Sequence, residues 1–290
     1  MNILIFLCLF LFTDISANND EKEEIETVKI GNLALPTSQM PGPLVSFGQN
    51  TVDKGDLQAF VFPDILKGKN REFVEVAPSI LYGIRDDLSI FIEFSVAAKF
   101  KEDGQQSHGI EDTLIQFEYT FYNKQSLTYI DQATIVTGIV IPTGSAFKIP
   151  PTGFGSLSIF LGATASHTAT DWYYFVSPAA LLTTSHRGTK FGNIFFYQAG
   201  LGKNISYVPD KWIFTWMVEF DGTCRQRDRI LGSIDPDSGG NTILLGPSLW
   251  FSTQHLILQA GISWVISQHL FGIQNKDTYF ASANIGWKFN

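Results

Sequence analysis

The stretch WIFTWMVEFDG, Trp212–Gly222, alternates two kinds of side chain. The positions between its apolar residues carry smaller or more polar side chains and end in two acids, Glu219 and Asp221. Because successive side chains of a strand point to opposite faces, this spacing predicts a strand with one apolar and one more polar face. The apolar face would carry Trp212, Phe214, Trp216, Val218 and Phe220.

The same two-residue period recurs from Gly55 to the C-terminus, and helical spacing is rare. Two clear examples are LSIFIEFSVAA, Leu88–Ala98, and YFASANIGWKF, Tyr279–Phe289. Each segment has about ten residues, the length of a strand, and the number of such segments predicts about twelve strands. They fall near residues 55–66, 71–83, 88–100, 111–122, 126–141, 155–167, 171–184, 191–205, 210–221, 242–252, 254–267 and 278–289.

Segments of this length match a tilted crossing of a lipid bilayer, whereas strands of globular sheets are usually shorter. Hydrocarbon offers no hydrogen-bond partner to an open sheet edge, so a spanning sheet must close. We therefore predict an all-β chain that forms a closed antiparallel transmembrane β-barrel of about 12 strands over residues 55–290. A soluble β-sandwich or barrel is the alternative. On the barrel hypothesis the lipid-facing residues include Trp212, Phe214, Trp216, Phe220, Trp287 and Phe289.

The connections between the segments alternate between long and tight. Expected long loops include Lys101–Gly109, Pro142–Gly153 and Gly222–Asn241, each followed by a tight turn after the next strand. Outer-membrane barrels have short periplasmic turns and longer extracellular loops. The loop pattern therefore favours a bacterial outer-membrane protein.

The N-terminus reads MNILIFLCLFLFTDISA, with an apolar core from Ile3 to Phe12 and small or polar residues up to Ala17. This pattern predicts a secretory signal peptide over residues 1–17, with an uncleaved short anchor as the alternative. Residues 18–54 begin with acids and continue with repeated Pro, Gly and Ser. We expect them to form a periplasmic segment or a plug of the barrel. Delivery to the outer membrane implies the barrel-insertion machinery and the lipid bilayer as partners.

Composition excludes several other functions. The net charge of −8 and the absence of a basic tract argue against a nucleic-acid partner. Cys8 would leave with the signal peptide, so Cys224 has no disulfide partner within the mature chain. The serines adjacent to His167 and His186 would point to opposite faces from these histidines, and no histidine pair has metal-ligand spacing. We therefore expect no catalytic residues, no metal and no cofactor.

The polar faces of the strands predict the residues that line the lumen. The predicted lining is weakly acidic. Anion channels need rows of Lys and Arg, so this lining fits neutral or cationic solutes, or an apolar molecule, better than an anion. Alternatively, the carboxylates pair with internal basic residues and only hold the wall. The lumen-lining candidates are Glu75, Glu93, Glu118, Glu219, Lys99, Lys288, Phe91, Phe160, Phe175 and Trp250.

Four stretches resemble a known family. These are QNTVDKGDLQAFVF (Gln49–Phe62), LYGIRDDLSIFIEFSV (Leu81–Val96), GIEDTLIQFEYTFY (Gly109–Tyr122) and GIVIPTGS (Gly138–Ser145). Together they are similar to the outer-membrane barrel family named for the meta-pathway of phenol degradation. The resemblance implies that Asp86 or Asp87 caps a turn, and that the chain transports hydrophobic or aromatic compounds.

The sequence thus predicts a channel for passive passage of small neutral or hydrophobic molecules, including aromatic ones. One alternative is an outer-membrane barrel enzyme that acts on lipid. Another is a surface-exposed barrel that binds a partner through Gly222–Asn241.

Overall fold

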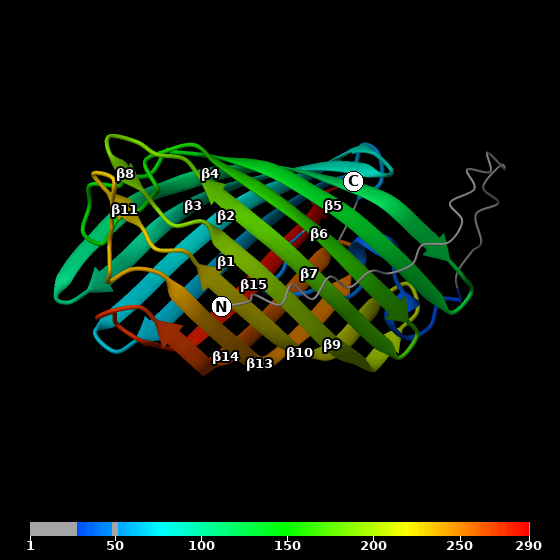
Figure 1. Ribbon diagram of the computed structural model, residues 1–290. Coiled ribbons are helices and arrows are strands. Elements are labelled where there is room, and N and C mark those ends of the chain that lie inside the picture. Colours follow the sequence, from blue (N-terminus) through cyan, green and yellow to red (C-terminus); the bar gives the residue numbers. More distant parts are fainter. Residues whose placement is uncertain (1–27, 48–51, 290) are drawn as a thin grey trace, which may run out of the picture.

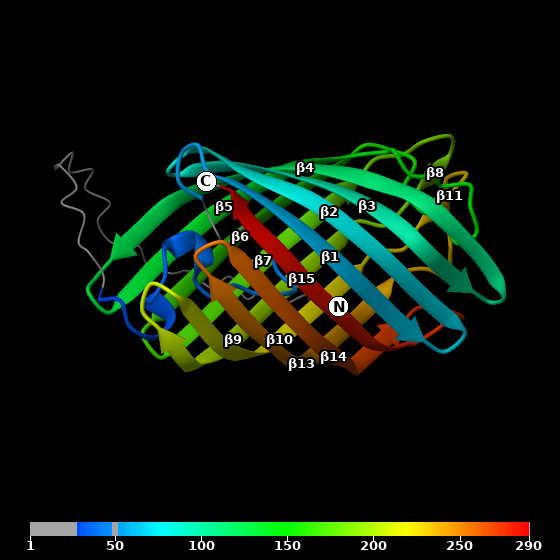
Figure 2. The ribbon, with the colours of Figure 1, turned by 180° about the vertical axis from the view of Figure 1, so that it is seen from behind.

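The computed structural model describes residues 28–47 and 52–289, and they form a closed barrel of twelve antiparallel strands (Figures 1 and 2). This confirms the predicted all-β fold. The predicted signal peptide, residues 1–17, lies outside the described residues. The barrel strands are β1 (Leu57–Gly68), β2 (Arg71–Arg85), β3 (Leu88–Glu102), β4 (Gln105–Gln125), β5 (Tyr129–Ile141), β6 (Ser158–Ala169), β7 (Trp172–Thr183), β9 (Ile194–Val208), β10 (Trp212–Arg225), β13 (Gly240–Thr253), β14 (Leu256–Leu270) and β15 (Asp277–Phe289).

Each barrel strand pairs with its two neighbours in chain order, and β1 closes the sheet by pairing with β15. The closing register places Leu57 opposite Phe289 and Ile65 opposite Ala281. Because both edges of the sheet are used in this way, the barrel exposes no unpaired strand edge. No helix among residues 28–47 and 52–289 is long and apolar enough to cross a membrane.

Strand β10 shows how the two faces differ. Trp216 is 36% exposed on the outer surface, whereas its neighbours Thr215 and Met217 are fully buried inside the barrel. On β15, Trp287 and Phe289 are 49% and 46% exposed. Trp212, Phe214 and Phe220 share the outward face of Trp216, because side chains two residues apart on a strand point the same way.

The two ends of the barrel have different connections. At one end all five turns are short, as between β2 and β3 or between β13 and β14. At the other end, residues 142–157, 184–193 and 226–239 form long loops. The prediction of a long loop at Lys101–Gly109 was wrong, because β4 already begins at Gln105 and leaves a two-residue turn. Asp103 and Gly104 in that turn have φ values of +49° and +80°, as a tight hairpin turn requires.

The long loops carry a small second sheet that the sequence did not predict. It consists of β8 (Thr189–Lys190), β11 (Arg229–Ile230) and β12 (Ser233–Ile234), and β11 lies between the other two. Two of these strands come from the predicted loop Gly222–Asn241. The loop itself is shorter than predicted and spans residues 226–239, because β10 continues to Arg225 and β13 begins at Gly240. Strands of two residues are too short to show a period, so the sequence pattern does not reveal them.

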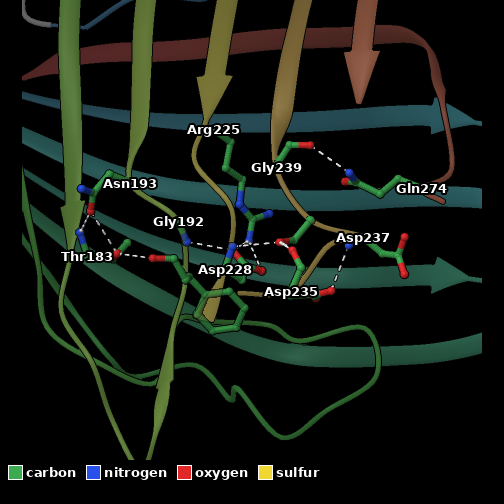
Figure 3. A network of polar contacts seen from close by, with 11 residues as sticks. Thr183, Gly192, Asn193, Arg225, Asp228, Asp235, Asp237, Gly239 and Gln274 are labelled. Atoms are coloured by element: carbon green, nitrogen blue, oxygen red, sulfur yellow. Dashed lines mark hydrogen bonds and ion pairs between the residues drawn. The ribbon is translucent and has the colours of Figure 1, made fainter. Parts of the chain in front are cut away.

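Polar contacts tie together three loops at this end, residues 184–193, 226–239 and 271–276 (Figure 3). Asp228 accepts hydrogen bonds from Arg225 at 2.9 Å and from the backbone N–H of Gly192 at 2.7 Å. The Gln274 side chain donates to the carbonyl oxygen of Gly239 at 2.8 Å. These three loops therefore form one connected layer.

Asp112 on β4 fixes both ends of the loop between β5 and β6. Its Oδ1 accepts a hydrogen bond from Gly144 N–H at 2.9 Å, and its Oδ2 accepts one from Phe154 N–H at 2.6 Å. Asp112 lies in the stretch Gly109–Tyr122 and Gly144 in the stretch Gly138–Ser145, both quoted above. The structure therefore gives these two stretches a shared structural role in holding this loop.

We predict that Asp112→Ala loosens this loop. The variant loses two hydrogen bonds to a charged acceptor, each of which contributes about 1.5–3 kcal/mol. Chymotrypsin should cleave after the 73% exposed Phe147 at least about tenfold faster than in the unmodified protein. Asp112→Asn keeps one acceptor oxygen and should give an intermediate rate. Equal cleavage rates for all three proteins would contradict this role of Asp112.

Candidate lumenal binding site

The barrel encloses a cavity of about 350 Å³ between the inner wall and residues 43–47. We call it the lumenal cavity. Its volume lies within the range of small-molecule sites in proteins. Its wall comes mainly from β1, β2, β3, β4 and β15, and it combines carboxylates with aromatic rings. The carboxylates are Asp64, Glu75, Glu93, Glu118 and Asp221, and the aromatic residues are Phe47, Phe60, Phe62, Phe91, Trp250 and Phe280.

Three of these carboxylates lie on adjacent strands. Asp64 on β1 is the direct cross-strand partner of Glu75 on β2, and Glu93 on β3 lies opposite Ser79, four residues further along β2. Asp64 and Glu93 lie near Glu75, and the side chains of Glu75 and Glu111 share a hydrogen bond. Like charges directly opposite each other destabilise a sheet. Among residues 28–47 and 52–289, no Lys, Arg or His forms an ion pair with Asp64, Glu75 or Glu93.

The other two predicted acids are held by neutral donors. Glu118 is 4% exposed and accepts a hydrogen bond from the Gln116 side chain at 2.7 Å. Glu219 is 2% exposed, and its Oε2 accepts the backbone N–H groups of Leu44 at 2.9 Å and Val45 at 3.1 Å. Its Oε1 accepts a hydrogen bond from Ser248. Glu219 therefore binds the N-terminal segment.

Residues 28–47 lie against the inner wall, at the end of the barrel opposite β8 and β11 (Figure 1). The segment contains two short 3-10 helices, η1 (Gly31–Leu33) and η2 (Thr37–Gln39). Its backbone carbonyl groups accept hydrogen bonds from inward-facing side chains of the wall. These bonds run from Ser252 to Gln39 at 2.7 Å, from Gln259 to Gly42 at 2.9 Å and from Thr164 to Phe47 at 2.9 Å.

Gly31 and Asn32 fix the start of this segment. Gly31 has a φ of +58°, and a Cβ atom there would lie 1.8 Å from the carbonyl oxygen of Thr170. Glycine is thus the residue that permits this close approach. Asn32 is fully buried, donates to the carbonyl oxygen of Ala169 at 3.1 Å and accepts from Thr215 at 2.9 Å.

The structure places the predicted lumenal aromatic residues inside the barrel. Phe91 and Trp250 line the lumenal cavity, and Phe175 belongs with Trp250 to a buried apolar cluster. Phe160 contacts Phe47 of the N-terminal segment edge to face, with ring centroids 4.9 Å apart. The interior of the barrel is therefore partly apolar.

The two predicted lysines have different positions. Lys288 points inward, where it forms an ion pair with Asp56 at 2.5 Å and donates to Ser38 of the N-terminal segment at 3.4 Å. The prediction that Lys99 lines the lumen was wrong. Ala97 pairs with Glu75 and Lys99 pairs with Val74, which leaves Ala98 between them without a partner on β2. This β-bulge reverses the alternation and turns Lys99 outward. On that outer face Lys99 pairs with Glu72 at 2.8 Å.

Sequence reasoning missed Asp64 and Asp221 as lining residues. Asp64 follows Phe60 and Phe62 at two-residue spacing, so the period that defined the strand also placed it inside. Asp221 shares the face of Glu219 for the same reason.

The turn between β2 and β3 differs from the aspartate capping that the family resemblance implies. Asp86 accepts a hydrogen bond from Lys54 N–H at 2.9 Å, and Asp87 pairs with Arg85 at 2.9 Å.

Similarity to known proteins comes from structure alone, because no protein-family model and no curated protein matches the chain. An outer membrane channel from Pseudomonas putida F1 is similar with a TM-score of 0.66 and 12% identity, over 86% of this chain and 99% of that one. At this identity the similarity shows a shared fold.

Two other solved structures are similar at lower scores. The β domain of the Bordetella autotransporter BrkA has a TM-score of 0.45 and 9% identity, over 82% of this chain and 100% of that one. LpxR from Salmonella typhimurium has a TM-score of 0.45 and 6% identity, over 79% of this chain and 99% of that one.

We predict that Glu219→Ala releases the N-terminal segment from the wall. The N–H groups of Leu44 and Val45 lose their acceptor, and each such bond contributes about 1.5–3 kcal/mol. Their amide hydrogens should exchange with solvent at least about tenfold faster, as measured by hydrogen exchange with mass spectrometry. Glu118→Ala is the matched control, because Glu118 is equally buried and bonds Gln116. Unchanged exchange in Glu219→Ala would contradict the anchoring role.

Proposed function

We propose that this chain is a channel of the bacterial outer membrane for the passive passage of small neutral or hydrophobic molecules, including aromatic ones. The observation that carries this proposal is the lumenal cavity, which lies inside a closed barrel whose outer surface is apolar. A barrel in lipid needs closed edges and an apolar outer belt, and this chain has both. The fold shared with the Pseudomonas putida channel supports the same function.

The lining supports a solute with apolar surface. Rings of Phe60, Phe62 and Phe91 and the indole of Trp250 form one part of the wall, so an aromatic or aliphatic body can pack there. The acidic residues oppose anions, because an anion would have to approach Asp64, Glu75 and Glu93 without a basic group to offset its charge. This agrees with the resemblance of four sequence stretches to the phenol meta-pathway family.

We further propose that residues 28–47 act as a plug that narrows the lumen from the periplasmic side. The segment lies at the end of the barrel with short turns, and it forms one wall of the lumenal cavity. On this proposal residues 1–17 are a signal peptide, and the barrel-insertion machinery folds the remaining chain into the bilayer. A solute would pass when part of the plug leaves the wall.

We predict that the purified protein in liposomes admits neutral and aromatic solutes faster than anions of the same size. Swelling rates would measure this selectivity. Impermeability to every solute would contradict the channel proposal.

A disulfide tests the plug separately. The hydroxyl groups of Ser46 and Ser177 lie 2.7 Å apart, so cysteines at both positions can form a bond. The exposed Cys224 is first replaced by serine. We expect oxidation of the Ser46→Cys/Ser177→Cys variant to slow swelling several-fold, and reduction to restore it. The single variant Ser46→Cys controls for the substitution. Equal rates before and after reduction would contradict a moving plug.

A further inference from the structure

The carboxylates of the lumenal cavity have no role in the passage of a neutral solute, and their arrangement is costly. Asp64 and Glu75 face each other directly, and Glu93 lies on the next strand. None of the three has an ion-pair partner among the described residues. Their side-chain hydrogen bonds are with Ser282 for Asp64, Ser95 for Glu93 and Glu111 for Glu75, and none of these partners carries a positive charge.

A second feature of the cavity points to a ligand with hydrogen-bond donors. Asn284 lines the cavity and is 7% exposed, and its Oδ1 accepts no hydrogen bond from the described part of the chain. A buried acceptor without a donor costs about 1–3 kcal/mol. One oxygen of Asp64 is likewise buried and without a donor in the described structure. The cavity therefore offers oxygen acceptors of two kinds to a ligand that brings N–H groups.

The remaining lining distinguishes an organic cation from a metal ion. Within residues 28–47 and 52–289, no three acidic, histidine or cysteine side chains converge closely enough to hold a metal ion. Phe62 lies next to Asp64 on the inner face of β1, and Phe91 lies next to Glu93 on that of β3. Aromatic faces attract cations and also pack against apolar groups.

From these contacts we infer that the lumenal cavity binds an organic ammonium ion, in which a protonated amine is carried on an aromatic or aliphatic body. The amine lies among Asp64, Glu75 and Glu93, donates to their oxygens and to Asn284, and offsets the repulsion between the carboxylates. The body packs against Phe62 and Phe91. This inference rests on the proposed channel function and assigns a substrate class to its lumen.

The experiment compares three probes of similar size on the purified full-length protein: 2-phenylethylammonium, neutral 2-phenylethanol and anionic phenylacetate. Binding is measured in detergent by isothermal titration calorimetry. We expect affinity to fall at least about tenfold from the cation to the neutral probe, because a charge-assisted contact is lost. The anion should bind more weakly still. Equal affinity for the three probes would overturn the inference.

Variants locate the site. Glu75→Gln and Glu93→Gln each keep the shape of the side chain and should lower the affinity for the cation about tenfold, with no change for 2-phenylethanol. Phe91→Leu should lower the affinity for both 2-phenylethylammonium and 2-phenylethanol. The matched control is Glu102→Gln, because Glu102 lies at the rim in an ion pair with Arg71. Cation binding that is insensitive to Glu75→Gln and Glu93→Gln would overturn the site.

The results separate this inference from the channel function. The probe comparison on the unmodified protein does not depend on whether a variant folds, and circular dichroism checks that each variant keeps its barrel. Cation binding without any swelling of liposomes would refute the channel and keep the site. Swelling with neutral solutes but no preference for the cation would keep the channel and refute the site.

Discussion

The pairing of β1 with β15 is the constraint on which the rest of the structure depends. Without this closure, two strands of a long sheet would carry unpaired N–H and C=O groups, which hydrocarbon cannot satisfy. Closure also divides every strand into an outer and an inner face, because neighbouring side chains alternate. On β10 this places Trp216 on the outer surface and Glu219 inside, because residues an odd number of positions apart point to opposite faces.

The interior then has to satisfy its own polar groups. Near the end with short turns, the wall supplies Ser, Thr and Gln side chains and one carboxylate, Glu219, and residues 28–47 supply the matching backbone groups. Residues 43–47 border the lumenal cavity, where Asp64, Glu75 and Glu93 have no ion-pair partner within the described part of the chain. The same wall therefore holds the proposed plug in one part and forms the proposed ammonium site in another.

The sequence was sufficient for the regular part of this fold and insufficient for its exceptions. Long strands with a period of two, such as β10 and β15, fixed the number of strands and put Glu75, Glu93, Glu118 and Glu219 on one face. The extra residue at Ala98 reversed the alternation and moved Lys99 outward, and nothing in the letters marks such a bulge. The start of β4 was missed because Gln105, Gln106, Ser107 and His108 are all polar. Many contacts of residues 28–47 use backbone groups, which every sequence has, so composition cannot locate them.

The division between an outer face in lipid and an inner face in the lumen is tested most directly by spin labels along β10. In a background with Cys224→Ser, single cysteines replace Phe214, Thr215, Trp216, Met217 and Val218, and each labelled protein is placed in liposomes. Collision with dissolved oxygen, which concentrates in hydrocarbon, should be high at positions 214, 216 and 218 and low at 215 and 217. A profile without this alternation, or with the opposite phase, would contradict the account.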